Sequence, residues 1–143
     1  MRKISILRNV FTMLALLVAV SSCDKDKEKD PAPDLGTKAA GIYIFSELEF
    51  EGNTIPADKS NLKGDIRLVR KTATTVDAEL DIRLKSTNED FMVYDVSDIQ
   101  LSENSGTIEL TYEGEKVAEI KGKKVIVNGT DDAGVDFKLT ATR

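Results

Sequence analysis

The sequence has no histidine and no tryptophan, and Cys23 is its single cysteine among 143 residues. Without histidine, the chain lacks the side chain whose ordinary pKa suits proton transfer near neutral pH. A single thiol cannot build an internal disulfide or a zinc–thiolate cluster. Acidic residues outnumber basic ones and the net charge is −5, so no basic surface is expected for nucleic acid. We therefore expect no enzyme activity, no metal or other cofactor, and no nucleic-acid partner.

Carboxylates are the remaining candidates for acid–base chemistry. Asp77, Glu79 and Asp81 alternate with apolar residues, which places them together on the solvent face of a strand. Solvated carboxylates lack the shifted pKa that acid–base catalysis requires. Asp131 and Asp132 lie between two glycines and are interpreted as an acidic turn. Neither group predicts a catalytic or metal site.

The first 22 residues have the composition of an export signal. Three basic residues open the segment: Arg2, Lys3 and Arg8. The apolar run at 10–20 is too short for the hydrocarbon core of a bilayer, which takes about 20 helical residues. Small residues at 21–22 then precede Cys23. A basic start, a short apolar run and a small-residue cleavage site are typical of a signal peptide, which we predict over residues 1–22.

The stretch Val20-Ser21-Ser22-Cys23 resembles the lipobox of bacterial lipoproteins, in which a branched apolar residue stands three positions before the cysteine. The resemblance implies cleavage after Ser22, a diacylglyceryl group on the Cys23 thiol and an acylated amino group. More than one acyl chain gives stable membrane anchoring. It further implies an outer-membrane lipoprotein in the envelope of a Gram-negative bacterium, facing the periplasm or the cell surface, with the membrane as a partner through its lipid.

The segment after the cysteine is expected to be a tether. It opens with seven alternating charges at 24–30 and continues with Pro31-Ala32-Pro33. Such a segment buries too little apolar surface to offset the entropy of ordering it. We therefore predict a lipidated, disordered tether over residues 23–40 and a single folded domain over residues 41–143.

From Gly41 onward the sequence predicts strands. The clearest pattern runs from Val76 to Leu84, where apolar residues occupy every even position and charged residues every odd one. This period of two indicates a strand with one buried and one solvated face. Glu113-Gly114 and Lys121-Gly122 are typical of two-residue hairpin turns. Eight strands are predicted: 41–50, 64–71, 75–85, 91–101, 106–112, 115–120, 123–128 and 134–142.

This pattern predicts an all-β fold in which an antiparallel meander of about eight strands closes into a small barrel, with a β-sandwich as the alternative. Closing the sheet would remove its exposed edges. The first strand alternates less cleanly than the others, and we expect Tyr43 and Phe45 on its outward face. The segment 51–63 is expected to be a surface connection that could also cover one end of the barrel.

Gly41-Ile42-Tyr43, the long first connection and the final strand resemble the calycin-like or lipocalin-like domains of bacterial lipoproteins over residues 40–143. Tyr43 stands where the lipocalin signature has tryptophan. The resemblance implies a barrel that binds a small apolar or amphipathic ligand. The aromatic candidates for contacting that ligand are Tyr43, Phe50, Phe91, Tyr112 and Phe137.

A second interpretation stays open beside the first. An eight-stranded barrel is just wide enough to be filled by side chains or to hold one small ligand. If the barrel is filled, the domain would be a structural or interaction module that contacts a protein or glycan through its outer face or loops. The outward placement expected for Tyr43 and Phe45 would then supply apolar contact surface.

Overall fold

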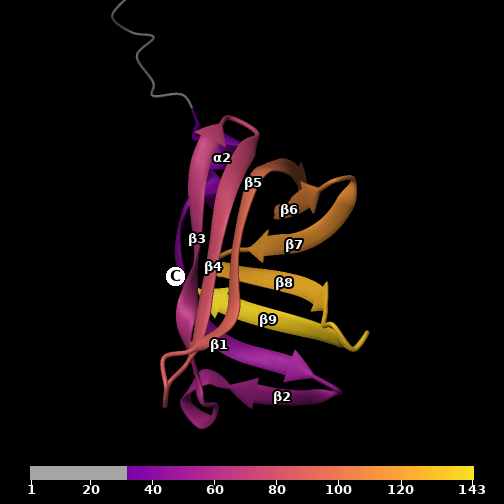
Figure 1. Ribbon diagram of the computed structural model, residues 1–143. Helices are drawn as coiled ribbons and strands as arrows, with labels where there is room; N and C mark the ends of the chain where they lie inside the picture. Colours follow the sequence, from indigo (N-terminus) through magenta and orange to yellow (C-terminus); the bar gives the residue numbers. More distant parts are fainter. Residues whose placement is uncertain (1–31) are drawn as a thin grey trace, which may run out of the picture. The chain divides into compact units, whose positions relative to one another are not determined.

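The computed structural model describes residues 32–143, so the predicted signal peptide, Cys23 and the first half of the predicted tether lie outside the described residues. The described chain contains a short helix followed by nine strands (Figure 1). Their bounds are α2 Leu35–Ala39, β1 Gly41–Phe50, β2 Asn53–Pro56, the 3-10 turn η2 Ala57–Lys59, β3 Leu62–Thr72, β4 Thr75–Leu84, β5 Asp90–Asn104, β6 Thr107–Tyr112, β7 Glu115–Lys121, β8 Lys124–Thr130 and β9 Asp136–Thr142.

The strands form an antiparallel barrel. From β3 to β9 each strand pairs with the next, and β9 pairs with β1 to close the sheet. The other edge of β1 is shared, because Gly41–Ile44 pairs with β3 and Glu47–Phe50 pairs with β2. The predicted all-β meander barrel is therefore confirmed, with β2 as one extra strand.

The strand β2 falls where the sequence predicted only a connection. Glu51 and Gly52 both have positive φ, 51° and 77°, and form a two-residue turn between β1 and β2. Positive φ at both central positions matches the twist of a tight hairpin. The sequence signal was weak because only four residues pair after the turn.

The strand β4 follows its sequence pattern. Val76 and Ile82 are fully buried, and the other even positions are partly buried. On the opposite face, Asp81 accepts a hydrogen bond from the Arg83 guanidinium at 2.6 Å and Glu79 pairs with Arg67 at 3.4 Å. The apolar stripe faces the core because that orientation removes it from water while leaving the charges solvated.

The faces of β1 are the reverse of the prediction. Tyr43 and Phe45 are buried, whereas Ile42 and Ile44 are 50% and 57% exposed. Both faces of this strand carry apolar residues, so alternation alone could not assign them. The aromatic pair buries more apolar area, and the Tyr43 hydroxyl donates a hydrogen bond of 2.8 Å to the Ala39 carbonyl. The polar tip is therefore satisfied inside the protein.

The helix α2 covers one end of the barrel, beside the β3–β4 turn. Asp34 caps it by accepting a hydrogen bond from the Thr37 amide at 2.8 Å, and it forms an ion pair with Arg70 at 2.8 Å. Ala39 is fully buried, and the Gly36 amide donates to the Ala73 carbonyl. The tether predicted over residues 23–40 is therefore too long at its C-terminal end, where Leu35–Ala39 forms α2. No helix in the described part of the chain is long and apolar enough to cross a membrane.

The C-terminus holds this end of the barrel together. The Arg143 guanidinium donates hydrogen bonds to the carbonyls of Ala40 and Lys38 at 2.8 and 2.9 Å. It also lies 5.0 Å from the centre of the Tyr43 ring, a cation–π distance. These contacts join α2, β1 and the end of β9.

Candidate ligand-binding cavity

An apolar cavity of about 200 Å³ lies inside the barrel. The tyrosine hydroxyls are the polar side-chain groups of its lining, and the other side chains are hydrocarbon. Its walls come from β3 through β9. The lining residues are Ile66, Leu68, Ala78, Leu80, Tyr94, Val96, Ile99, Leu110, Tyr112, Val117, Ala118, Val125, Val127 and Phe137. An interior of this kind can accept an apolar body and offers it no charged partner.

A groove of about 580 Å³, here called the mouth, lies at the end of the β4–β5 hairpin away from α2. It shares Tyr94 and Phe137 with the cavity, so the two spaces adjoin. Tyr94 is 61% exposed and Phe91 is 45% exposed. Its lining residues are Leu48, Phe50, Ile55, Phe91, Met92, Tyr94, Thr130, Asp131, Asp132 and Phe137.

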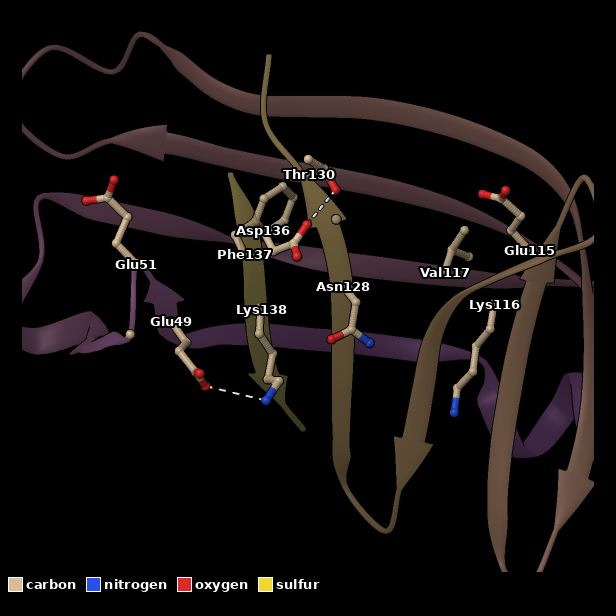
Figure 2. A pocket seen from close by; sticks show the side chains of 12 residues that line it. Glu49, Glu51, Glu115, Lys116, Val117, Asn128, Thr130, Asp136, Phe137 and Lys138 are labelled. Carbon is tan, nitrogen blue, oxygen red and sulfur yellow. Dashed lines mark hydrogen bonds and ion pairs between the residues drawn. The ribbon is translucent and has the colours of Figure 1, made fainter. Parts of the chain in front are cut away.

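A third space, here called the side opening, lies where β7 and β8 separate (Figure 2). The ladder between these strands covers only Ala118↔Val127 to Lys121↔Lys124. The segments 115–117 and 128–130 therefore have no partner across this gap. The opening measures about 630 Å³ and shares Val117 and Phe137 with the cavity.

Phe137 is common to the cavity, the mouth and the side opening. Its backbone partner on β8 is Gly129. The ring lies against the space that a side chain at Gly129 would occupy, and an added Cβ would come within 2.8 Å of Cε1. Glycine at position 129 thus makes room for the aromatic ring that separates the three spaces.

The two lysines of the side opening already have carboxylate partners. Lys138 pairs with Glu49 at 3.4 Å, and Lys116 pairs with Glu119 at 2.8 Å and Glu109 at 3.0 Å. The hydrogen bonds that Lys116 donates to Glu119 and Glu109 raise the pKa of Lys116. Figure 2 shows both lysines pointing away from the Phe137 ring.

The remaining acids of the opening have no such partner. Within residues 32–143, Glu51, Glu115 and Asp136 form no ion pair. Asp136 accepts one hydrogen bond, from the Thr130 hydroxyl at 2.9 Å. The lining of the side opening therefore carries uncompensated negative charge.

The structure brings four of the predicted aromatic residues to these spaces. Phe50 and Phe91 line the mouth, Tyr112 lines the cavity, and Phe137 lines both. Tyr43 lies instead at the end covered by α2, with its hydroxyl bonded to Ala39, and it lines none of the three spaces. Its role is in packing.

Sequence reasoning missed Tyr94 and the side opening. Tyr94 shares its alternation with Met92 and Val96, so the period of two along the predicted strand could have found it. The side opening depends on where the pairing between β7 and β8 stops, and neither strand's sequence signals that point. The alternation along 115–121 is interrupted at Val117-Ala118, but an interruption of this kind does not say where pairing with the neighbouring strand stops.

Two features that often mark a catalytic site are a cluster of metal-ligating side chains and carboxylates with shifted pKa values. Among the described residues, no group of three or more possible metal-ligating side chains is found. The lowered pKa of Asp34 arises from hydrogen bonds with Arg70 and Thr37, and the lowered pKa of Glu119 arises from Lys116 and Lys121. Both carboxylates belong to ion pairs, and neither lines any of the three spaces.

The fold and its hollows define a class of protein: a small closed β-barrel with an apolar interior that opens at one end and at one side. Comparison with known proteins adds no relative, because no protein-family model, no curated protein and no solved structure matches the chain.

Proposed function

We propose that the protein is a membrane-anchored envelope lipoprotein, without enzymatic activity, whose calycin-like barrel binds a small apolar or amphipathic molecule. The observation that carries this proposal is the apolar cavity of about 200 Å³ that adjoins an aromatic-lined mouth. Ligand sites are concave and mostly apolar, with few polar groups. The cavity and mouth together have this character.

The exposure of the aromatic side chains at the mouth supports the proposal. Tyr94, Phe91 and Ile55 are exposed although they are large and apolar. Water inside an apolar cavity finds few hydrogen-bond partners, so a hydrocarbon occupant would be preferred there. The cavity itself is smaller than typical ligand sites of about 300–1,000 Å³, so a ligand would extend into an adjoining space.

The proposed envelope location rests on the sequence before the barrel. The lipobox-like Val20-Ser21-Ser22-Cys23 would supply the anchor, and the charged segment after it would separate the barrel from the bilayer. Acidic protein surfaces are not attracted to anionic lipids. The acyl chains would therefore provide the membrane affinity.

Native mass spectrometry of the protein purified from the cells that produce it tests ligand binding. We expect a bound mass that is lost on denaturation, and its value would give the class of ligand. A bare polypeptide mass that does not change when lipids or retinoid-like compounds are added would contradict the proposal.

A second candidate function is an interaction module for a protein or glycan. The specific observation is the outer face of β1 and β3, where Ile42 and Ile44 lie exposed and Val69 is 49% exposed. Exposed apolar clusters often mark interaction sites. Replacing Ile42 and Ile44 with threonine should release a co-purifying partner from detergent-solubilised membranes. Purification of the unaltered chain alone would count against this candidate.

A further inference from the structure

We infer that the ligand is an amphiphile with a cationic or hydrogen-bond-donating head group, which lies in the side opening while the apolar body fills the cavity. The inference rests on the proposed ligand-binding function and adds the class of ligand and the position of its head. It follows from three features of the barrel: the adjacency of the spaces, the end of the β7–β8 ladder, and the distribution of charge.

Adjacency comes first. Val117 and Phe137 line both the cavity and the side opening, so the two spaces adjoin at these side chains, and a molecule that occupied both would pass beside them from hydrocarbon walls to polar ones. The mouth offers less to a head group, because its aromatic and aliphatic residues dominate. Its Asp131 carboxylate already accepts hydrogen bonds from the amides of Ala133 and Val135 at 2.9 and 2.8 Å.

The unpaired strand segments give the opening its polar character. Beyond Ala118↔Val127, the backbone at 115–117 and 128–130 has no partner across the gap. The Asn128 side chain also lines the opening. Backbone groups left without a cross-strand partner are strong hydrogen-bonding sites for water or for a bound polar group.

Charge selects the kind of head group. Lys116 and Lys138 are already paired with Glu119, Glu109 and Glu49, so an anion would bind either lysine only in competition with a carboxylate. Glu51, Glu115 and Asp136 carry the uncompensated charge of this lining. Figure 2 shows Glu51 and Glu115 on opposite sides of the opening, with Asp136 between them. A cation beside any one of these carboxylates gains Coulomb attraction, whereas a carboxylate head would be repelled.

The test compares three probes with the same dodecyl chain: dodecylammonium, dodecanol and dodecanoate. The protein used comprises residues 23–143 with Cys23→Ala, so that no acyl chain of its own can enter the barrel. The assay measures the concentration at which each probe displaces a bound neutral naphthylamine fluorophore from this protein. We expect dodecylammonium to displace the fluorophore at a concentration about fivefold below dodecanoate, which corresponds to one or two partly exposed charge pairs. Dodecanol should lie between them.

Two triple variants locate the effect. Glu51→Gln, Glu115→Gln and Asp136→Asn together should remove the preference for the amine while leaving dodecanol displacement unchanged. The matched control is Asp58→Asn, Asp65→Asn and Asp95→Asn, which removes the same charge at positions outside the opening. The control should retain the preference.

The outcomes separate the two proposals. If neither the fluorophore nor dodecanol binds the Cys23→Ala protein with its acidic residues intact, the proposed ligand-binding function is wrong. If all three probes bind equally, or if both triple variants lose the preference alike, the barrel binds apolar molecules but the head group does not lie in the side opening.

Discussion

At the scale of single residues, the contact between Gly129 and Phe137 decides how the three spaces are divided. The Phe137 ring lies over Gly129 and lines all three hollows. Aromatic rings fix such boundaries because they are large and have only two side-chain torsions to restrict. A side chain added at residue 129 should therefore move the Phe137 ring and alter the shape of all three spaces.

We predict that Gly129→Ala destabilises the protein by about 1–3 kcal/mol, because the added methyl group overlaps the Phe137 ring. In a protein that already carries Phe137→Ala, adding Gly129→Ala should lower the free energy of unfolding little further, since the overlapping ring atoms are gone. Chemical denaturation of the two single variants and the double variant measures the coupling. Additive effects would mean that the ring does not occupy this position in solution.

At the scale of elements, the sequence predicts best where the two faces of a strand differ most. In β4 charged and apolar residues alternate without exception from Val76 to Leu84, and this pattern correctly predicts which face of the strand points inward. Tyr43 and Phe45 alternate instead with Ile42 and Ile44, and only packing against the interior decides between the pairs. Periodicity cannot resolve such a choice because both answers satisfy it.

The helix α2 and the side opening show a different limit. Five residues give too little periodicity to predict a helix, and α2 depends on contacts with Arg70, Ala73 and Arg143 that are distant in sequence. Likewise the cavity aromatics could be placed inward from alternation, but the gap beside Val117 lies where the β7–β8 ladder ends and the β6–β7 register shifts. Neither feature has a local sequence signal.

We predict that Asp34→Asn weakens the attachment of α2 at neutral pH. Asparagine still caps a helix, so the substitution removes the charge opposite Arg70 while keeping a capping side chain. In the folded protein the hydrogen bond from Arg70 holds the pKa of Asp34 well below its ordinary range. A lowered folded-state pKa stabilises the fold above the ordinary pKa of about 3.9 and loses that contribution as the pH falls further.

Thermal unfolding of both proteins across this pH range measures the effect. The unaltered chain should melt at the higher temperature near neutral pH, and the difference should shrink in acid. It should also shrink in concentrated salt, because the pair is solvent-exposed. A difference that stays constant with pH would mean that the substitution acts through the cap and not through the ion pair.

At the scale of the whole molecule, the proposed anchor is tested separately from the barrel. Cys23→Ala should abolish metabolic labelling with palmitate and release the protein from the membrane fraction. Cys23→Ser is a second variant that preserves size and polarity, and it should behave in the same way because the thioether cannot form. Palmitate labelling that persists in either variant would show that the lipid is attached elsewhere, or that the lipobox interpretation is wrong.

The last prediction concerns the space inside the barrel. Ala118 and Ala141 are both buried small residues on the sheet, but only Ala118 lines the cavity. Enlarging a residue in a packed core costs about 1–3 kcal/mol, whereas a neighbouring void can absorb the added atoms. We therefore expect Ala118→Leu to change the free energy of unfolding little while weakening binding of the naphthylamine fluorophore.

Ala141→Leu is the matched control, because it adds the same atoms beside Phe45 and Val125, its partners on the neighbouring strands. It should destabilise the protein and leave the cavity unchanged, so that the folded fraction binds the fluorophore as before. Equal destabilisation by the two substitutions would mean that side chains fill the barrel in solution. That result would favour the second candidate function, in which the exposed face of Ile42 and Ile44 contacts a partner.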